Sequence, residues 1–267
     1  MNIYRFELKS LRKSTIIWTC SIIGLAALYL SIYPSMAEDA ADFKKLLAAY
    51  PAPVREMLGI NIDTIGSLLG FYSMVFSFIS LFGSIQAMNF GVSILSKESR
   101  ERTADFLFVK PVSRNSIVTA KLFASLTMIL ATNIVFCLAT SILANIVKTA
   151  DYSSKVFLLI NLTLLFIQLI FLAIGMVVSV FFRKIKNVLP ISLGFVFGFY
   201  LIGAVLAVGE NDEYARVMSP FKYFDITYII NNGSYETMYL LISAVIILVS
   251  IAVTYLIFNK KDIHAVN

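Results

Sequence analysis

Long apolar runs without charges, separated by short charged stretches, account for most of the chain. Six runs exceed the roughly 18 apolar residues that mark a candidate transmembrane helix. They cover residues 14–37, 64–96, 122–147, 156–182, 187–209 and 237–259. The pattern predicts an all-α integral membrane protein with six transmembrane helices, at approximately residues 15–34, 65–91, 122–147, 156–182, 188–208 and 237–258.

Composition supports a membrane protein and leaves no room for a separate soluble domain. Hydrophobic residues make up 59% of the chain and charged residues 14%, against about 45–50% and about 25% in soluble domains. We expect a single transmembrane domain over residues 1–267. The first run could be taken for a cleaved signal peptide, because residues 35–37 imitate a cleavage site. Its apolar part exceeds the usual 7–15 residues of such peptides, which favours a retained helix.

Basic residues predict the orientation, because cytoplasmic loops retain Lys and Arg. With six spans both termini lie on one side, and that side carries fifteen of the 22 basic residues. Both termini are therefore predicted to be cytoplasmic. The net charge of +6 mostly reflects this asymmetry, so it gives no reason to expect a nucleic-acid partner.

The segments outside the spans predict short helices at the membrane surface. In residues 1–13, Tyr4, Leu8 and Leu11 share one helical face opposite basic residues, which predicts an interfacial elbow helix. The alternative is a basic tail that only sets orientation. Residues 38–63 and 210–236 predict further surface helices, with Gly59 as a helix stop. The second segment is rich in aromatic residues, which we expect at the headgroup level.

Several catalytic classes are excluded by what the sequence lacks. The only histidine is His264, so neither a metalloprotease motif nor a Ser–His pair can be built within the spans. Cys20 and Cys137 both fall in spans and indicate neither a disulfide framework nor a zinc site. No charged residue lies in a span core, which argues against a proton-driven carrier but leaves a neutral sodium site open. We expect a protein without catalytic, cofactor or metal-binding residues.

Polar and small residues within the spans have a structural interpretation. Six polar residues within or near the ends of the spans are expected to form hydrogen bonds between helices. The alternative is that they line a substrate path. They are Gln86, Asn89, Asn133, Asn145, Asn161 and Gln168. Gly66-x-x-x-Gly70 and Gly194-x-x-x-Gly198 permit close helix approach. We expect them to pack within the chain, with a dimer seam as the alternative.

The loop over residues 97–121 presents an apolar cluster among charges. Thr103 is a candidate N-cap, Asp105 would lie near the positive end of a helix dipole, and Pro111 cannot continue a helix. The pattern predicts a short helix over residues 104–109. It exposes three apolar residues, Phe106, Leu107 and Phe108. Such a cluster fits a groove on a partner protein, or alternatively the bilayer interface.

The order of residues in this loop resembles that of type-2 ATP-binding-cassette (ABC) exporter permeases. The matching residues are Glu98, Thr103, Phe106-Leu107, Pro111-Val112-Ser113-Arg114, Ile117 and Lys121. The resemblance extends to the elbow, the six spans and "SPFKYFD" before the last span. The loop departs from the family pattern at two positions, where Arg102 replaces the usual Gly and Phe106 replaces one Leu.

The resemblance implies that the loop contains a coupling helix, which docks on a cytoplasmic ATPase subunit. The implied ATPase-coupling residues are Glu98, Arg100, Glu101, Thr103, Asp105, Phe106, Leu107, Phe108, Pro111 and Arg114. Two such ATPase subunits, with their ATP and Mg, and a second permease copy or paralogue are the implied partners. The first, second and fifth spans would line the substrate path, which nominates Tyr72, Gln86, Phe195, Phe199 and Tyr200.

The expected function is export of an amphipathic, peptide, drug or lipid-like substrate across a bacterial cytoplasmic membrane, driven by ATP hydrolysis in the partner. Two alternatives remain at this stage. A scaffold or sensor subunit would share the topology and the apolar cluster, because it also recruits a cytoplasmic protein. A sodium-coupled carrier would transport without any partner.

Overall fold

The computed structural model describes residues 3–51, 54–55, 58–101, 113–182, 185–206 and 216–260. Within them six helices are long and apolar enough to cross a membrane. They are α1 (Ile3–Glu38), α4 (Leu68–Glu101), α6 (Arg114–Val147), α7 (Ser154–Phe181), α8 (Val188–Leu206) and α11 (Thr237–Lys260). The prediction of an all-helical protein with six long apolar helices is therefore confirmed.

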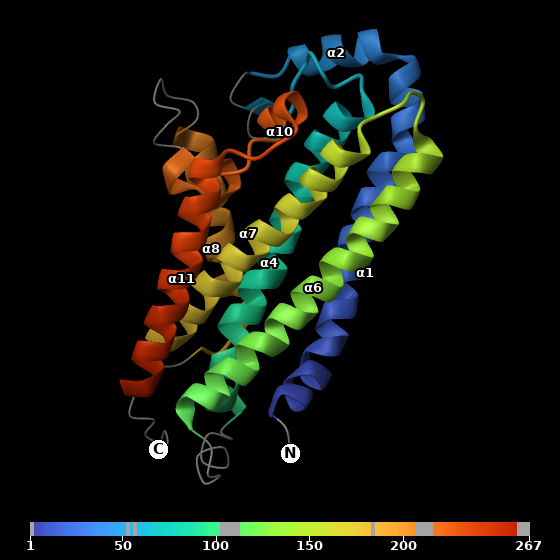
Figure 1. The fold of residues 1–267 in the computed structure, drawn as a ribbon. Coiled ribbons are helices and arrows are strands. Elements are labelled where there is room, and N and C mark those ends of the chain that lie inside the picture. Colours follow the sequence, from blue (N-terminus) through green and yellow to red (C-terminus); the bar gives the residue numbers. More distant parts are fainter. Residues whose placement is uncertain are drawn as a thin grey trace.

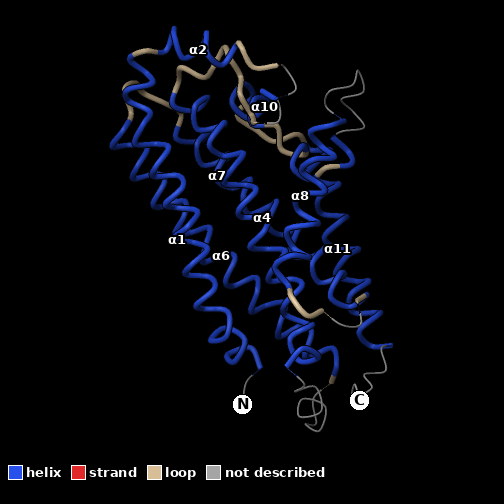
Figure 2. Tube along the Cα trace, turned by 180° about the vertical axis from the view of Figure 1, so that it is seen from behind, coloured by secondary structure: helices blue, strands red, loops and turns tan. Residues whose placement is uncertain are grey.

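The six long helices form one elongated bundle (Figure 1). In its centre α4 packs along α7, and α4 also contacts α1, α6 and α8. Helices α1 and α6 pair on one flank, while α8 and α11 lie on the other (Figure 2). We call the end where α1 begins and α11 ends the termini end, and the opposite end the α2 end, after the short helix α2 (Ala40–Ala48).

The first helix runs without a break through residues 3–13 into the first span. Its buried residues recur every three or four positions, as on one face of a helix. They are Glu7, Leu11, Thr15, Thr19, Ile22, Ala26, Leu30 and Tyr33. Because this row continues across Lys13, the same neighbours hold both parts, and the expected separate elbow helix is replaced by the first turns of α1.

The helix that contains the third span starts at Arg114, before residue 122 where the span was predicted to begin. Ser113 caps the helix, because its side chain accepts a hydrogen bond from the backbone N–H of Ser116 at 3.2 Å. Helix α4, which contains the second span, in turn continues to Glu101. The connection between these helices is thus shorter than the predicted loop 97–121.

The segments at the α2 end fold back onto the bundle. Gly59 and Gly233 adopt positive φ of 66° and 63°, and Gly233 ends α10 (Ile226–Asn232). Before α10 lies the 3-10 turn η1 (Pro220–Lys222). The ring of Phe224 stacks on Phe166 of α7, with centroids 5.5 Å apart.

Tyr223 is buried like Phe224 and stacks on Tyr239 of α11. Burial raises the pKa of the Tyr223 hydroxyl, which donates a hydrogen bond to the carbonyl oxygen of Val217 at 2.8 Å. These two aromatic residues pack inside the protein, and their expected position at the headgroup level stays a prediction.

Glycines set the distance between the two central helices. A Cβ atom on Gly91 of α4 would collide with the carbonyl oxygen of Leu172 and lie 2.9 Å from the Cα of Gly175 on α7. A Cβ on Gly175 would lie 2.8 Å from the carbonyl oxygen of Met88. The backbones of α4 and α7 therefore meet where both helices lack side chains, the arrangement that small residues permit in membrane helices.

The Gly194-x-x-x-Gly198 pair on α8 behaves differently. Added Cβ atoms at Gly194 and Gly198 would meet nothing within 4 Å. The expectation that these two glycines pack against another helix of the same chain is therefore wrong for the described residues. Among the described residues the face of α8 that carries them has no neighbour, and the alternative of a seam with another subunit stays a prediction.

Candidate functional site

The residues that flank the predicted coupling loop gather at the termini end. Helix α4 ends at Glu101 and α6 begins at Arg114, so these two helices are the stems of the segment 102–112. The side chains on the stems contact α1 on one side and α11 on the other. We call this set of contacts the stem junction.

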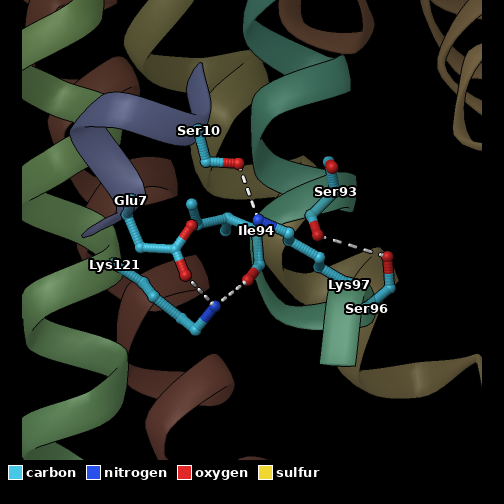
Figure 3. Close-up of polar contacts among 7 residues, drawn as sticks. All are labelled: Glu7, Ser10, Ser93, Ile94, Ser96, Lys97 and Lys121. Atoms are coloured by element: carbon cyan, nitrogen blue, oxygen red, sulfur yellow. Dashed lines mark hydrogen bonds and ion pairs between the residues drawn. The ribbon is translucent and has the colours of Figure 1, made fainter. Parts of the chain in front are cut away.

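A buried ion pair joins α6 to the first turns of α1. The Lys121 ammonium lies 2.8 Å from Oε1 of Glu7, and it also donates a hydrogen bond to the carbonyl oxygen of Ile94 on α4 at 2.7 Å (Figure 3). The two side chains are only 1% and 2% exposed. A buried pair offsets its desolvation cost only with good geometry and added hydrogen bonds. Here the ammonium has such a bond to Ile94, whereas Oε2 of Glu7 is buried without a partner among the described residues.

A second contact ties α4 to α1 one turn further along. The Lys97 ammonium donates a hydrogen bond to Oγ of Ser10 at 2.6 Å and lies 4.9 Å from the centroid of the Phe6 ring. Figure 3 shows Lys97 and Lys121 approaching α1 from the two stems. The beginning of α1 therefore holds the end of α4 and the start of α6 together.

The other side of the junction joins α6 to the last turn of α11. The Arg114 guanidinium donates to the carbonyl oxygen of Asn259 at 3.0 Å, and Nδ2 of Asn259 donates to Oδ1 of Asn115 at 2.6 Å. A cation that bonds the last carbonyls of a helix is favourable, because those carbonyls lack partners in their own helix. The hydroxyls of Thr119 and Tyr255 also lie 2.7 Å apart.

Of the predicted coupling residues, only Arg114 has a described side chain, and it lies in the stem junction. Three others belong to the last turns of α4, where their side chains are not described: Glu98, Arg100 and Glu101. The remaining six lie outside the described residues: Thr103, Asp105, Phe106, Leu107, Phe108 and Pro111. Their docking role stays a prediction.

The predicted path residues occupy different environments. Tyr72 is fully buried and donates a hydrogen bond to Oδ1 of Asn161 at 2.8 Å. Gln86 is also buried, and its Nε2 donates to the hydroxyl of Thr132 at 3.0 Å. Phe195 and Phe199 are half-buried on α8. Tyr200 lines a cavity at the α2 end. In this conformation Tyr72 and Gln86 face other helices, so their path role also stays a prediction.

Polar side chains in the bundle form a network that crosses four helices. Gln168 of α7 accepts from Nδ2 of Asn133 at 2.6 Å and donates to Oε1 of Gln86 at 3.1 Å. Gln86 reaches Thr132, whose hydroxyl lies 2.9 Å from that of Thr19 on α1. The prediction of hydrogen bonds between helices is confirmed for Gln86, Asn133, Asn161 and Gln168.

We expect Gln168→Leu to lower the free energy of unfolding by about 2 kcal/mol. The variant loses three hydrogen bonds, to Asn133, Gln86 and the carbonyl oxygen of Gly83, and such bonds average about 0.6 kcal/mol each in membrane proteins. Unfolding by SDS in mixed micelles measures the change. Asn145→Leu is the control, because the Asn145 amide donates within its own helix, to Ser141. Equal stability of the two variants would contradict the interhelical role.

The sequence did not indicate the buried ion pair. Lys121 was assigned to the loop 97–121 and to the resemblance, and Glu7 was not assigned to the face of Tyr4, Leu8 and Leu11. One signal was present: Glu7 precedes Leu11 by four residues, so it begins the row that is buried along α1.

Together the fold and the stem junction define a class: a multi-pass helical membrane protein with two long helices that frame a charged connection at one end. The sequence model of the ABC-2 family transporter proteins matches residues 1–263. The chain therefore belongs to the ABC-2 transporter family, whose members are membrane subunits. No curated protein matches the sequence.

Proposed function

We propose that the chain is the permease subunit of an ABC exporter, which forms the membrane passage while a separate subunit hydrolyses ATP. The observation that carries the proposal is the family match over residues 1–263. The six long apolar helices agree with it, because a passage across a bilayer needs such helices.

In this proposal the termini end faces the cytoplasm and residues 102–112 contact the ATPase. The excess of basic residues at that end supports the orientation. The stem junction supports the coupling role, because Lys121 and Arg114 tie α6 to both α1 and α11. A displacement of the loop would therefore reach three helices at once.

The working complex would contain two ATPase subunits, with ATP and Mg bound in them, and two permeases. The free face of α8 at Gly194 and Gly198 is the surface we propose for the second permease, a copy or a paralogue. Close approach through small residues is common between membrane helices. The substrate would pass between the permeases as an amphipathic, peptide, drug or lipid-like molecule.

Truncation of the apolar cluster tests the proposal. We expect Phe106→Ala with Leu107→Ala to reduce co-purification of the ATPase at least tenfold and to reduce ATP-driven export in proteoliposomes with it. Loss of a buried aromatic anchor from an interface commonly costs 2 kcal/mol or more, which corresponds to about 30-fold in affinity.

The matched control is Phe123→Ala with Leu130→Ala. These side chains are 56% and 46% exposed on α6 and belong to its outer, apolar face. The control should retain the ATPase. Should the loop variant hold the ATPase as well as this control does, the docking role of Phe106 and Leu107 is wrong. If no ATPase accompanies the unmodified chain, the proposed function itself fails.

A further inference from the structure

A cavity of about 700 Å3 opens at the α2 end, between α4 and α8. One wall is a row of serines on α4, Ser73, Ser77 and Ser80. Tyr200 and Gly203 of α8 form part of the opposite wall. The segments around Gly59 and η1 complete the lining. Figure 1 shows α10, whose first residues also line the cavity, at this end of the bundle. The stem junction is at the other end, so the two features are separate.

Three cations line the cavity, and one of them is already paired. Arg216 forms an ion pair with Glu236 at 2.5 Å, and its guanidinium lies 4.2 Å from the centroid of the Tyr239 ring. Burial lowers the pKa of Arg216, but the bond and charge of Glu236 outweigh that and raise it, so the guanidinium stays charged. Arg216 is held by these partners and closes the wall of the cavity.

Among the described residues, the other two cations of the lining, Arg55 and Lys222, have no such ion pair. The Nε atom of Arg55 is buried and has no hydrogen-bond partner. The Lys222 ammonium forms no hydrogen bond or ion pair with any of the described residues. A buried donor without a partner is uncommon in folded proteins and calls for an explanation, such as a bound ion. Arg55 and Lys222 are thus available to a ligand.

The acidic residues of the lining do not account for these cations. Asp225 caps α10, because its Oδ1 accepts from the backbone N–H of Thr227 at 2.8 Å. Asp63 is exposed, and among the described residues its carboxylate has no recorded ion pair. Among the described residues of the lining, three cations face the carboxylates of Asp63 and Asp225, and neither Arg55 nor Lys222 forms an ion pair with them. The cavity therefore favours an anionic ligand.

The remaining wall residues indicate what accompanies the anion. The hydroxyls of Ser77 and Ser80 donate to backbone carbonyls of α4, so their lone pairs are free to accept from hydroxyl groups of a ligand. Aromatic rings of Tyr200, Phe221 and Phe224 line the cavity beside them. These walls suit a molecule with both polar and apolar parts.

We propose that this cavity binds a phosphate ester, with Arg55 and Lys222 holding the phosphate. A phosphate presents several charged oxygens in different directions, so it can meet two cations from separate segments. The ester could be the headgroup of a membrane lipid or a water-soluble molecule. A role of this site in export rests on the proposed function, whereas binding of the phosphate ester to the cavity does not.

Binding of an acyl-labelled fluorescent phosphatidylglycerol to the full chain, purified with any subunits that accompany it, tests the proposal by anisotropy. We expect Arg55→Gln with Lys222→Gln to weaken binding at least tenfold. Arg55→Lys should retain most of the affinity, because it keeps the charge. The control is Lys45→Gln with Lys148→Gln, which removes the same charge outside the cavity lining.

Competition by unlabelled molecules distinguishes the sources of the phosphate. Displacement by short-chain phosphatidylglycerol, but only weakly by glycerol 3-phosphate, supports a lipid headgroup. Equal displacement by glycerol 3-phosphate supports a water-soluble ester. Equal displacement by diacylglycerol would overturn the proposal, and so would unchanged affinity in the Arg55 and Lys222 variant. ATP-driven export is measured separately, so its absence would count against the proposed function and not against this site.

Discussion

Replacement of Lys121 by Met is expected to lower the free energy of unfolding by about 3–5 kcal/mol. The substitution leaves the Glu7 carboxylate buried at 2% exposure after it has lost the ammonium 2.8 Å away. Its Oε2 atom has no partner to begin with, so no other donor among the described residues compensates. An uncompensated buried charge has a cost of this size, and it exceeds the value of the pair itself. Unfolding by SDS in mixed micelles measures the loss.

A second substitution separates the cost of the orphaned charge from the loss of packing. We expect Glu7→Leu in the Lys121→Met background to recover most of the lost stability, because apolar replacements of a buried pair are often neutral. Lys97→Met is the matched control. The Lys97 ammonium is partly exposed and bonded to Ser10, so we expect a change below about 1 kcal/mol. A Lys121→Met protein as stable as this control would contradict the prediction.

The ion pair also shows why the sequence predicted the helices better than their boundaries. Length and composition alone identify a helix that can cross a membrane, so the six helices could be read from uncharged runs. That method places every charge outside a span. Lys121 instead lies within α6, because Glu7 and the carbonyl oxygen of Ile94 compensate its charge. Such partners come from distant parts of the chain, and a single sequence does not reveal them.

A similar limit applies to the small and aromatic residues. Gly194 and Gly198 of α8 have the spacing expected for close packing, yet they have no neighbour among the described residues. The close approach occurs at Gly91 and Gly175, which belong to different helices and form no short motif. Likewise, Tyr223 and Phe224 resemble interfacial aromatics in sequence but stack on Tyr239 and Phe166. Which helices pack together decides whether such a glycine or aromatic residue is in a contact, and the spacing of residues along the chain does not reveal that packing.

The crossing of the central helices gives a second large expected effect. We expect Gly91→Val to lower the free energy of unfolding by about 3 kcal/mol, near the upper end of the usual cost of overpacking. Its Cβ would collide with the carbonyl oxygen of Leu172, which is backbone and cannot turn aside as a side chain would. Helices α4 and α7 would have to separate along the contact that joins them at the centre of the bundle. SDS unfolding again gives the magnitude.

Gly24→Val is the control for this prediction, since it makes the same change within a long helix. A Cβ on Gly24 would meet nothing within 4 Å, and Val is slightly better than Gly in a helix. The control should therefore be as stable as the unmodified chain or slightly more so. If Gly24→Val loses as much stability as Gly91→Val, the loss comes from placing Val in a membrane helix and not from the helix crossing. A loss confined to Gly91→Val would locate it at the crossing of α4 and α7, where the backbones leave no room for a side chain.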